Sequence, residues 1–515
     1  MRLGPHNPMS DARPKRAGRK ARTAARAAGP PSNPAPPGQL GGLYKPLNTQ
    51  EIKGIYDTAL RLLADLGMGE VPDRLRQSLE AVGATLTATG RVTLPHSLVE
   101  DAIAAAPKTF PLHARDPARS IEVGGEAVHF GTGGAAVQTL DRKTRQYRAS
   151  TLADLHDFTR LQDSLTNVSW FTRCCIATDL PDEWTLDVNT AYALLRNTTK
   201  PVATAFTLAE HVAPIVAMFD MAAGGDGTFV RRPFVKAHIS PVISPMRFGA
   251  DAVDTTYACL EHNIPVSCIT AAQAGATAPA TLAGFLAQSL AETLASLVMV
   301  HAIKPGHPMV FSNWPFVIDL RTGAFSGGGG EIAVMNAASA QIINWLGLVS
   351  GVAASMTDAK ALDAQYGAEK GLTSLAAALA GGNLIYESSG MTSALLGASF
   401  EGFVLDDEMH GHTYRILRGV EVSDATLDYE GICAAVLGEG HFLGGAATIA
   451  AMERDYVYPT LADRDAPRAW AEAGALTAWD RASVRVDEIL AAEVTDYIDR
   501  DTDAKIRAAF DIRYP

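Results

Sequence analysis

Short apolar runs rich in β-branched residues alternate with helical stretches along most of this 515-residue chain, and this alternation restricts the fold more than any other feature. Seven runs are clear, at 169–178, 201–207, 233–240, 265–271, 308–314, 351–357 and 383–389, and AVHFGTG at 127–133 offers an eighth. Strands alternating with helices build βαβ units and a parallel sheet. Eight units favour an α/β fold of the closed TIM (β/α)₈ barrel type over an open doubly wound sheet. No GxGxxG follows the first strand, which counts against a dinucleotide fold.

Four parts are expected along the chain. Residues 1–38 are rich in Arg and Lys and then in Pro, with Asp11 as the only acid, so we expect a disordered basic tail. A solvated tail and weak attraction to RNA or an acidic partner are the alternatives for its role, and its start also resembles a transit peptide. An N-terminal α+β extension at 39–126, the barrel at 127–430 and a helical C-terminal extension at 431–515 follow.

Composition excludes several classes of protein. Apolar residues make up 47% of the chain and charged residues 19%, which allows a sizeable core, and the net charge of −12 argues against nucleic-acid binding by the folded part. No apolar run approaches a membrane span, and the five cysteines lack a disulfide pattern. We therefore expect a cytoplasmic globular protein that binds neither nucleic acid nor membrane, and we expect a homo-oligomer.

The glycine run in RTGAFSGGGGE, residues 321–331, lies in the loop after the strand expected at 308–314. Chemistry in a barrel collects on such loops. A phosphate loop would need Lys and then Ser or Thr after its last glycine, whereas Glu331 and Ile332 follow here. Glu331 suits a cation, although it could equally offset the dipole of the next helix. Gly328 and Gly329 then form a bare wall beside a substrate.

Several stretches are specific in combination. They are HFGTGGAAVQTLD (129–141), AQAGATAPATLAG (272–284), AIKPGHPMVF (302–311), GAFSGGGGE (323–331), TDAKALDAQYGAEKG (357–371), NLIYESSGM (383–391) and LGEGHFLGGAATIAAMERDYVYPTLADR (437–464). Together they resemble the trimethylamine methyltransferase superfamily of corrinoid-dependent methyltransferases over roughly residues 40 to 510. The resemblance implies a TIM barrel. It also implies methyl transfer from a methylated amine to cobalt in a separate corrinoid protein, with no cofactor bound tightly.

Two departures from the family pattern matter. Some members carry pyrrolysine at the position that matches Ile332, and this chain has none, so it resembles the branch of glycine betaine methyltransferases. Where relatives often have His after the HFLG glycines, this chain has Ala446 and Ala447.

The leaving group explains the first departure. A quaternary ammonium leaves as a neutral tertiary amine, so it needs neither a general acid nor a metal. The protein then has to hold and orient a cation, which aromatic faces and carboxylates do. We expect a betaine as methyl donor. A trimethylamine demethylase, a sulfonium demethylase (for example for dimethylsulfoniopropionate) and a non-catalytic quaternary-ammonium binder are the alternatives.

Site candidates come from the expected strand ends. The catalytic candidates are Glu331 and Asp358, and the substrate-binding candidates are His238, Phe311, Asn313, Trp314, Phe316, Gly328, Gly329, Gln365, Tyr366, Tyr386 and Glu387. Any of the aromatics could instead be core, and Asp358 could pair with Lys360. His238, Asn313, Gln365 and Arg321 are the possible donors to a substrate carboxylate. The histidines of HGH at 410–412 are not spaced as metal ligands, so no metal site is expected.

Overall fold

A computed structural model describes residues 33–514, and the chain divides into two compact units. One unit comprises Ala35–Val420 with Tyr458–Pro515, and the other comprises Met1–Pro34 with Glu421–Val457. Most of the basic tail expected at 1–38 lies outside the described residues.

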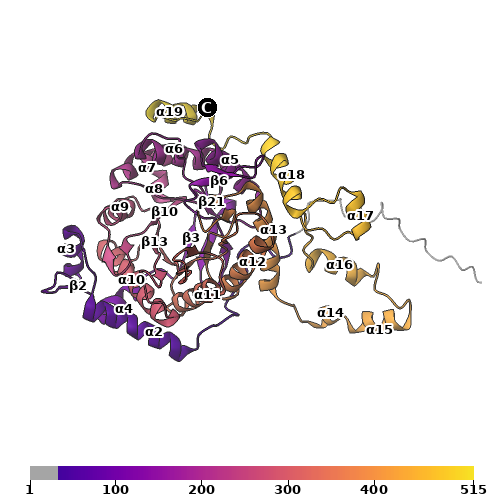
Figure 1. Ribbon diagram of the computed structural model, residues 1–515, viewed down its shortest axis with the longest axis horizontal. Coiled ribbons are helices and arrows are strands. Elements are labelled where there is room, and N and C mark those ends of the chain that lie inside the picture. Colours follow the sequence, from indigo (N-terminus) through magenta and orange to yellow (C-terminus); the bar gives the residue numbers. More distant parts are fainter. Residues whose placement is uncertain (1–32, 515) are drawn as a thin grey trace, which may run out of the picture. The chain divides into compact units, whose positions relative to one another are not determined.

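The larger unit is built on eight parallel strands (Figure 1). They are β5 (His129–Phe130), β8 (Phe171–Thr172), β9 (Val202–Thr204), β10 (Val235–Ile239), β13 (Val266–Thr270), β15 (Met309–Asn313), β18 (Ser350–Ala353) and β19 (Leu384–Tyr386). Their order is β8-β9-β10-β13-β15-β18-β19-β5. Between the two end strands, Ser169 N–H donates to the Phe130 carbonyl at 3.1 Å. Each strand overlaps one predicted run, so the TIM barrel prediction is confirmed.

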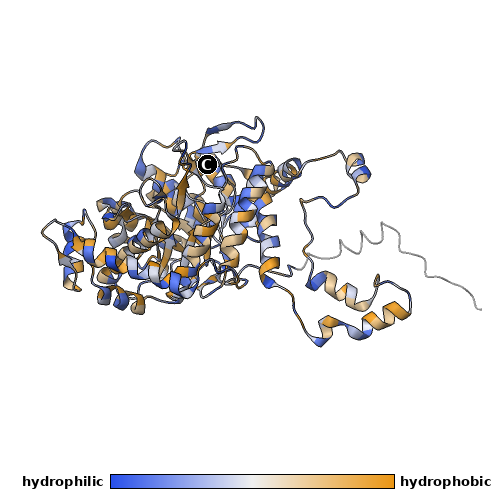
Figure 2. Ribbon diagram, turned by 60° about the horizontal axis from the view of Figure 1, so that its bottom comes forward, coloured by the Kyte–Doolittle hydropathy of each residue, from blue (hydrophilic) through white to orange (hydrophobic). Residues whose placement is uncertain are grey.

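A helix follows every strand and lies outside the sheet (Figure 1). These helices are α5 (Leu152–Ser164), α6 (Glu183–Asn197), α7 (Val212–Ala222), α9 (Ala250–Glu261), α10 (Leu282–Ile303), α11 (Gly330–Trp345), α12 (Ala364–Leu379) and α13 (Phe400–Arg418). Side chains cap several of them, as Asp363 does when it accepts from Gln365 N–H and Tyr366 N–H at the start of α12. Apolar and hydrophilic residues alternate along the outer helices in Figure 2, as expected for helices with one buried face.

Helix α10 corrects one expectation. By length and hydropathy alone, Leu282–Ile303 qualifies as a membrane span, which the sequence was expected to lack. However, 83% of its apolar window is buried inside the protein. It packs on β13 and β15 and against α2 (Thr49–Arg61) and α4 (His96–Ala105), so it is a core helix of the barrel.

Successive side chains on each strand point to opposite faces of the sheet, so they pack into two separate clusters. On β10, Val235, Ala237 and Ile239 pack in the cluster that includes the outer helices, whereas Lys236 and His238 have the opposite phase. On β19, Leu384 and Tyr386 share a second cluster, inside the barrel. The barrel therefore encloses a mixture of polar and aromatic side chains.

The remaining elements cover the two ends of the barrel. At the amino ends of the strands, the hairpin of β3 (Thr109–Leu112) and β4 (Ile121–Gly124) supplies Phe110, Leu112 and Val123 to the inner cluster. Short strands extend the loops at the carboxyl ends. They are β6 (Gln138–Leu140), β7 (Tyr147–Ala149), β11 (Val242–Ile243), β12 (Arg247–Phe248), β14 (Gln273–Ala274), β16 (Phe316–Ile318), β17 (Phe325–Ser326), β20 (Met391–Thr392) and β21 (Gly397–Ala398).

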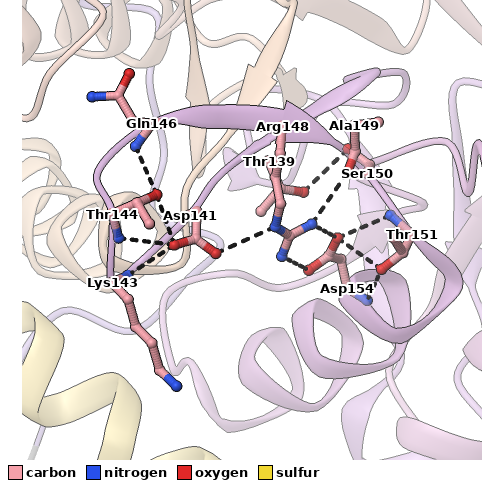
Figure 3. A network of polar contacts seen from close by, with 10 residues as sticks. All are labelled: Thr139, Asp141, Lys143, Thr144, Gln146, Arg148, Ala149, Ser150, Thr151 and Asp154. Atoms are coloured by element: carbon pink, nitrogen blue, oxygen red, sulfur yellow. Dashed lines mark hydrogen bonds and ion pairs between the residues drawn. The ribbon is translucent and has the colours of Figure 1, made fainter.

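The β6–β7 hairpin is fixed to helix α5 by Arg148 (Figure 3). Its guanidinium binds both carboxylate oxygens of Asp154 at 2.6 and 2.7 Å and reaches Asp141 at 3.3 Å. Asp154 also accepts from Thr151 N–H and closes a capping box. This bidentate pair orients the segment that follows β5.

Further helices and strands lie outside the barrel. In the N-terminal part these are η1 (Leu62–Leu66), α3 (Asp73–Ala81), β1 (Thr85–Leu86), β2 (Val92–Thr93) and η2 (Pro117–Arg119), with η3 (Ala209–His211) and α8 (Thr228–Arg231) in barrel loops. The smaller unit holds α14 (Asp424–Leu427), α15 (Tyr429–Leu437) and α16 (Ala446–Arg454), and the larger unit holds α17 (Pro467–Glu472), α18 (Ala478–Ala491) and α19 (Arg500–Ala509). The C-terminal extension expected at 431–515 thus contains helices of both units.

Candidate active site

A hydrogen-bonded row of polar side chains crosses the barrel interior. The Lys236 amine lies 2.6 Å from His238 Nε2 and 2.9 Å from the Tyr386 hydroxyl. That hydroxyl lies 2.6 Å from Ser267 Oγ, which lies 2.7 Å from Ser312 Oγ. Four strands, β10, β13, β15 and β19, therefore share one connected polar network.

Aromatic rings surround the Tyr386 ring. Trp170, Trp314 and His238 lie with ring centroids 4.6, 5.0 and 5.1 Å from it. The Lys236 amine lies 4.3 Å from the Trp170 centroid and 4.6 Å from that of Tyr386. Burial holds the pKa of Lys236 well below its usual value. The protein's own amine thus occupies part of the aromatic cage.

Glu387 directly follows β19 and has unusual properties for a carboxylate. Its side chain is buried, and its Oε2 atom has no hydrogen-bond partner among residues 33–514. Its backbone has φ +60°, a left-handed conformation that costs energy in a residue with a β-carbon. Burial raises the pKa of Glu387 to about 7, although the Lys370 charge and a hydrogen bond from the Gly134 backbone favour the ionised form. Strain together with an unpartnered buried oxygen is typical of a functional carboxylate.

Two glycines lie between Glu387 and His238. A β-carbon on Gly133 would lie 2.0 Å from Glu387 Oε2, so no side chain fits there. A β-carbon on Gly134 would meet only ordinary contacts, with Thr172 at 3.5 Å and His238 Nδ1 at 3.9 Å. The TGG segment after β5 therefore presents its backbone between a carboxylate and an imidazole, and Gly134 N–H donates to that carboxylate.

A buried ion pair supports the turn that carries Glu387. The Lys370 amine lies 2.8 Å from Asp406, which also accepts from Tyr366 OH and Gly390 N–H, both at 2.7 Å. Because both ionic groups are fully buried, the pair fixes the 387–390 turn relative to α12 and α13.

The glycine loop packs against acidic side chains of the protein itself. Asp358 accepts from Gly327 N–H at 2.7 Å and from Ser326 Oγ at 2.9 Å. A β-carbon on Gly328 would lie 2.3 Å from Glu369, a residue not singled out from the sequence. The described contacts give Asp358 and Gly328 a part in holding the loop, and their roles towards substrate stay predictions.

Glu331 and its neighbour face different surroundings. Glu331 is exposed in the first turn of α11, where a β-carbon on Gly329 would lie 2.8 Å from its carboxylate. Ile332 is fully buried in the cluster that contains Trp314 and Tyr386. The position that the resemblance matches to pyrrolysine therefore contacts the inner aromatic cluster.

The other predicted residues are spread over the fold. The ring centroids of Phe316 and Trp314 lie 6.3 Å apart, and Asn313 is buried with an Oδ1 atom that has no hydrogen-bond partner in the described part of the chain. Phe311 packs in the cluster of the outer helices, with the phase opposite to that of Ser312. Gln365 is exposed and donates to Glu369, and Tyr366 is buried against Asp406. Four of the predicted residues lie in or next to the barrel interior. They are His238, Trp314, Tyr386 and Glu387.

Sequence reasoning missed Trp170, Arg173, Lys236, Ser267 and Lys370. A lysine within the apolar strand PFVKAHIS was the strongest available signal, because a buried amine is rare without a function. Among the described residues, no group of three His, Cys, Asp or Glu side chains could hold a metal ion.

The architecture defines the class of protein first. Arg173, Trp314 and Glu387 directly follow β8, β15 and β19, at the carboxyl ends of the strands of a (β/α)₈ barrel, where enzymes of this fold have their active sites.

Comparisons with known proteins then define the family. The family model for trimethylamine methyltransferase (MTTB) matches residues 15–514, so the chain belongs to this family and is a methyltransferase. Over 478 residues it is 28% identical to the glycine betaine methyltransferase of Desulfitobacterium hafniense (strain Y51), covering 92% of this chain and 97% of that protein. It is 29% identical to trimethylamine methyltransferase MttB of Methanosarcina barkeri over 468 residues, 90% of this chain and 94% of the relative. Among solved structures, a dihydropteroate synthase from Xanthomonas albilineans aligns with a TM-score of 0.35 and 14% identity, covering 60% of this chain and 99% of that one.

Proposed function

We propose that this enzyme removes a methyl group from a quaternary amine, glycine betaine or a close relative, and passes it to cobalt(I) of a corrinoid on a separate protein. The observation that carries the proposal is Glu387, a buried, strained carboxylate with an oxygen unpartnered among the described residues, whose charge acts on Tyr386 of the aromatic cluster. A carboxylate in such surroundings attracts a cation more strongly than it would in water. Aromatic faces nearby add to the binding of a quaternary ammonium.

The reaction requires few functional groups from the protein. Cobalt(I) attacks the methyl carbon, the carbon–nitrogen bond breaks, and nitrogen keeps the electron pair as a neutral tertiary amine. No proton has to be supplied to the leaving group. The residues of this chain hold and aim the donor, and positioning alone supplies a large part of such a barrier. No cofactor has to stay bound to this chain, and the corrinoid acts as the second substrate.

Ile332 favours a donor that is already cationic. In the resemblance this position matches pyrrolysine, whose plausible use is to activate a neutral amine, and here an apolar side chain packs in the same cluster as Trp314 and Tyr386. The named activity of the Desulfitobacterium relative, on glycine betaine, supports the same donor class. Trimethylamine is the alternative that the Methanosarcina relative's name suggests. A sulfonium donor also remains chemically sensible, since its leaving thioether is neutral.

The catalytic role predicted for Glu331 moves to Glu387 in this proposal, because Glu331 is exposed and Glu387 is buried. The test compares Glu387→Gln with Glu331→Gln in methyl transfer from glycine betaine to reduced cobalamin. We expect Glu387→Gln to lower kcat/KM by about a hundredfold and Glu331→Gln by less than about threefold. The reverse order would return the role to the glycine loop. Trimethylamine and dimethylsulfoniopropionate assayed beside betaine would identify the donor class.

A further inference from the structure

Two basic side chains lie near the end of β8 and near the start of β10, and Asp187 acts on Arg173 only through its charge, without an ion pair in the described part of the chain. Arg173, directly after β8, has a buried Nη1 atom for which the described residues supply no hydrogen-bond partner. Lys236 donates only to His238 and Tyr386. Within residues 33–514 neither forms an ion pair with an acidic side chain. Buried cations are normally paired, because an isolated one is costly to desolvate.

His238 connects the two. Its Nε2 atom lies 2.6 Å from the Lys236 amine, and the Arg173 charge acts on the ring electrostatically. The Nδ1 atom has no hydrogen-bond partner in the described part of the chain, and it is the atom beside Gly134. When Lys236 donates to Nε2, the ring proton resides on Nδ1. His238 then presents an N–H donor towards the bare glycine segment.

We propose that Arg173, His238 and Lys236 form an anion subsite that binds the carboxylate of the methyl donor. This inference rests on the proposed function and deepens it. Gly133 and Gly134 separate this subsite from the Glu387 carboxylate. A ligand lying along the two glycines would place its ammonium at Glu387 and its anionic group at His238 and Arg173. The donor is accordingly a zwitterion with a short spacer between its two charges.

The arrangement separates this donor class from simpler cations. Tetramethylammonium carries the same positive head without an anionic tail, so it gains nothing from Arg173 or His238 and is repelled by the Arg173 charge. A carboxylate in the subsite would instead accept from Arg173 and from His238 Nδ1, while Lys236 holds the other ring nitrogen. The three residues therefore act as specificity determinants, while Glu387 attracts any quaternary ammonium.

Calorimetry with glycine betaine and tetramethylammonium on the full chain tests the subsite. Wild-type protein should bind glycine betaine at least about tenfold more tightly than tetramethylammonium. Arg173→Gln and Lys236→Met should weaken betaine binding about tenfold, while tetramethylammonium binds as well as before to Lys236→Met and as well or more tightly to Arg173→Gln, which removes a repelling charge. Arg485→Gln, an exposed change on α18, is the matched control and should alter neither.

Several outcomes would overturn the inference. Equal affinity of the wild type for both ligands, or equal weakening of both by Arg173→Gln, would mean that no anion subsite exists. Gly134→Ala supplies a second measurement that does not depend on removing a charge. Its added methyl group fits sterically and lies towards His238 Nδ1, so it should reduce betaine binding alone. Failure of the wild type to bind either cation would instead refute the proposed function itself.

Discussion

A β-carbon on Gly133 would lie 2.0 Å from Glu387 Oε2 and 2.6 Å from Met391 Cγ. The carboxylate at the end of β19 thus lies directly against the backbone that follows β5. This contact explains why a glycine is needed in HFGTGG, and it offers a way to displace the carboxylate without changing it.

Gly133→Ala should therefore abolish methyl transfer, since the new methyl group pushes Glu387 away from its position. We expect kcat/KM to fall by at least about a hundredfold, whereas Gly134→Ala should lower it far less for a donor without a carboxylate, such as tetramethylammonium. Methyl transfer to reduced cobalamin by the two variants provides the comparison. Similar losses with that donor would contradict the placement of the cation at Glu387.

The ionisation of Glu387 should make cation binding depend on pH. Burial raises its pKa to about 7, so the carboxyl is protonated below that pH and cannot attract a cation. Affinity for tetramethylammonium should rise about tenfold per pH unit below about pH 7 and become constant above it. Glu387→Gln should remove the slope. A flat profile in the wild type would show that another group holds the cation.

The same pKa shift affects stability with a definite sign. The pKa of Glu387 rises from 4.5 to about 7 on folding, so between these values the folded state keeps a proton that the unfolded state has lost. The contribution of Glu387 to the free energy of unfolding is fully present below about pH 4.5 and decreases as the pH rises to about 7. The total decrease is on the order of 3 kcal/mol. Glu387→Gln should raise Tm at pH 8 and leave it nearly unchanged near pH 4. Thermal melts at both pH values provide the test, and a lower Tm at pH 8 would contradict it.

Lys370 should influence both stability and the pH profile. Lys370→Met leaves Asp406 buried without its partner at 2.8 Å, which should cost about 3 kcal/mol in denaturant unfolding. Because the Lys370 charge lowers the pKa of Glu387, its removal should also shift the pH midpoint of cation binding upward. A merely structural role would leave that midpoint in place. Lys53→Met, in an exposed pair with Asp57, is the control.

The sequence predicted the barrel well because each buried strand is a continuous apolar run with a helix after it. It predicted the site less completely, because a run does not reveal which of two neighbouring residues faces inward. In FSNWPF, Trp314 lies inside the barrel and Phe311 faces the helices. Glu331 and Ile332, in the first turn of α11, differ in the same way, because Glu331 is exposed and Ile332 is buried. Lys236 was missed because its environment is set by β13 and β19, which are distant in the chain.

The most direct measurement of the central claim is methyl transfer from glycine betaine to reduced cobalamin by the wild type and Glu387→Gln, at pH 8, where the wild-type carboxylate is ionised. The account predicts turnover by the wild type, with dimethylglycine released in proportion to methylated cobalamin, and a loss of about a hundredfold in Glu387→Gln. No transfer from glycine betaine by the wild type, or equal rates for the two proteins, would contradict it.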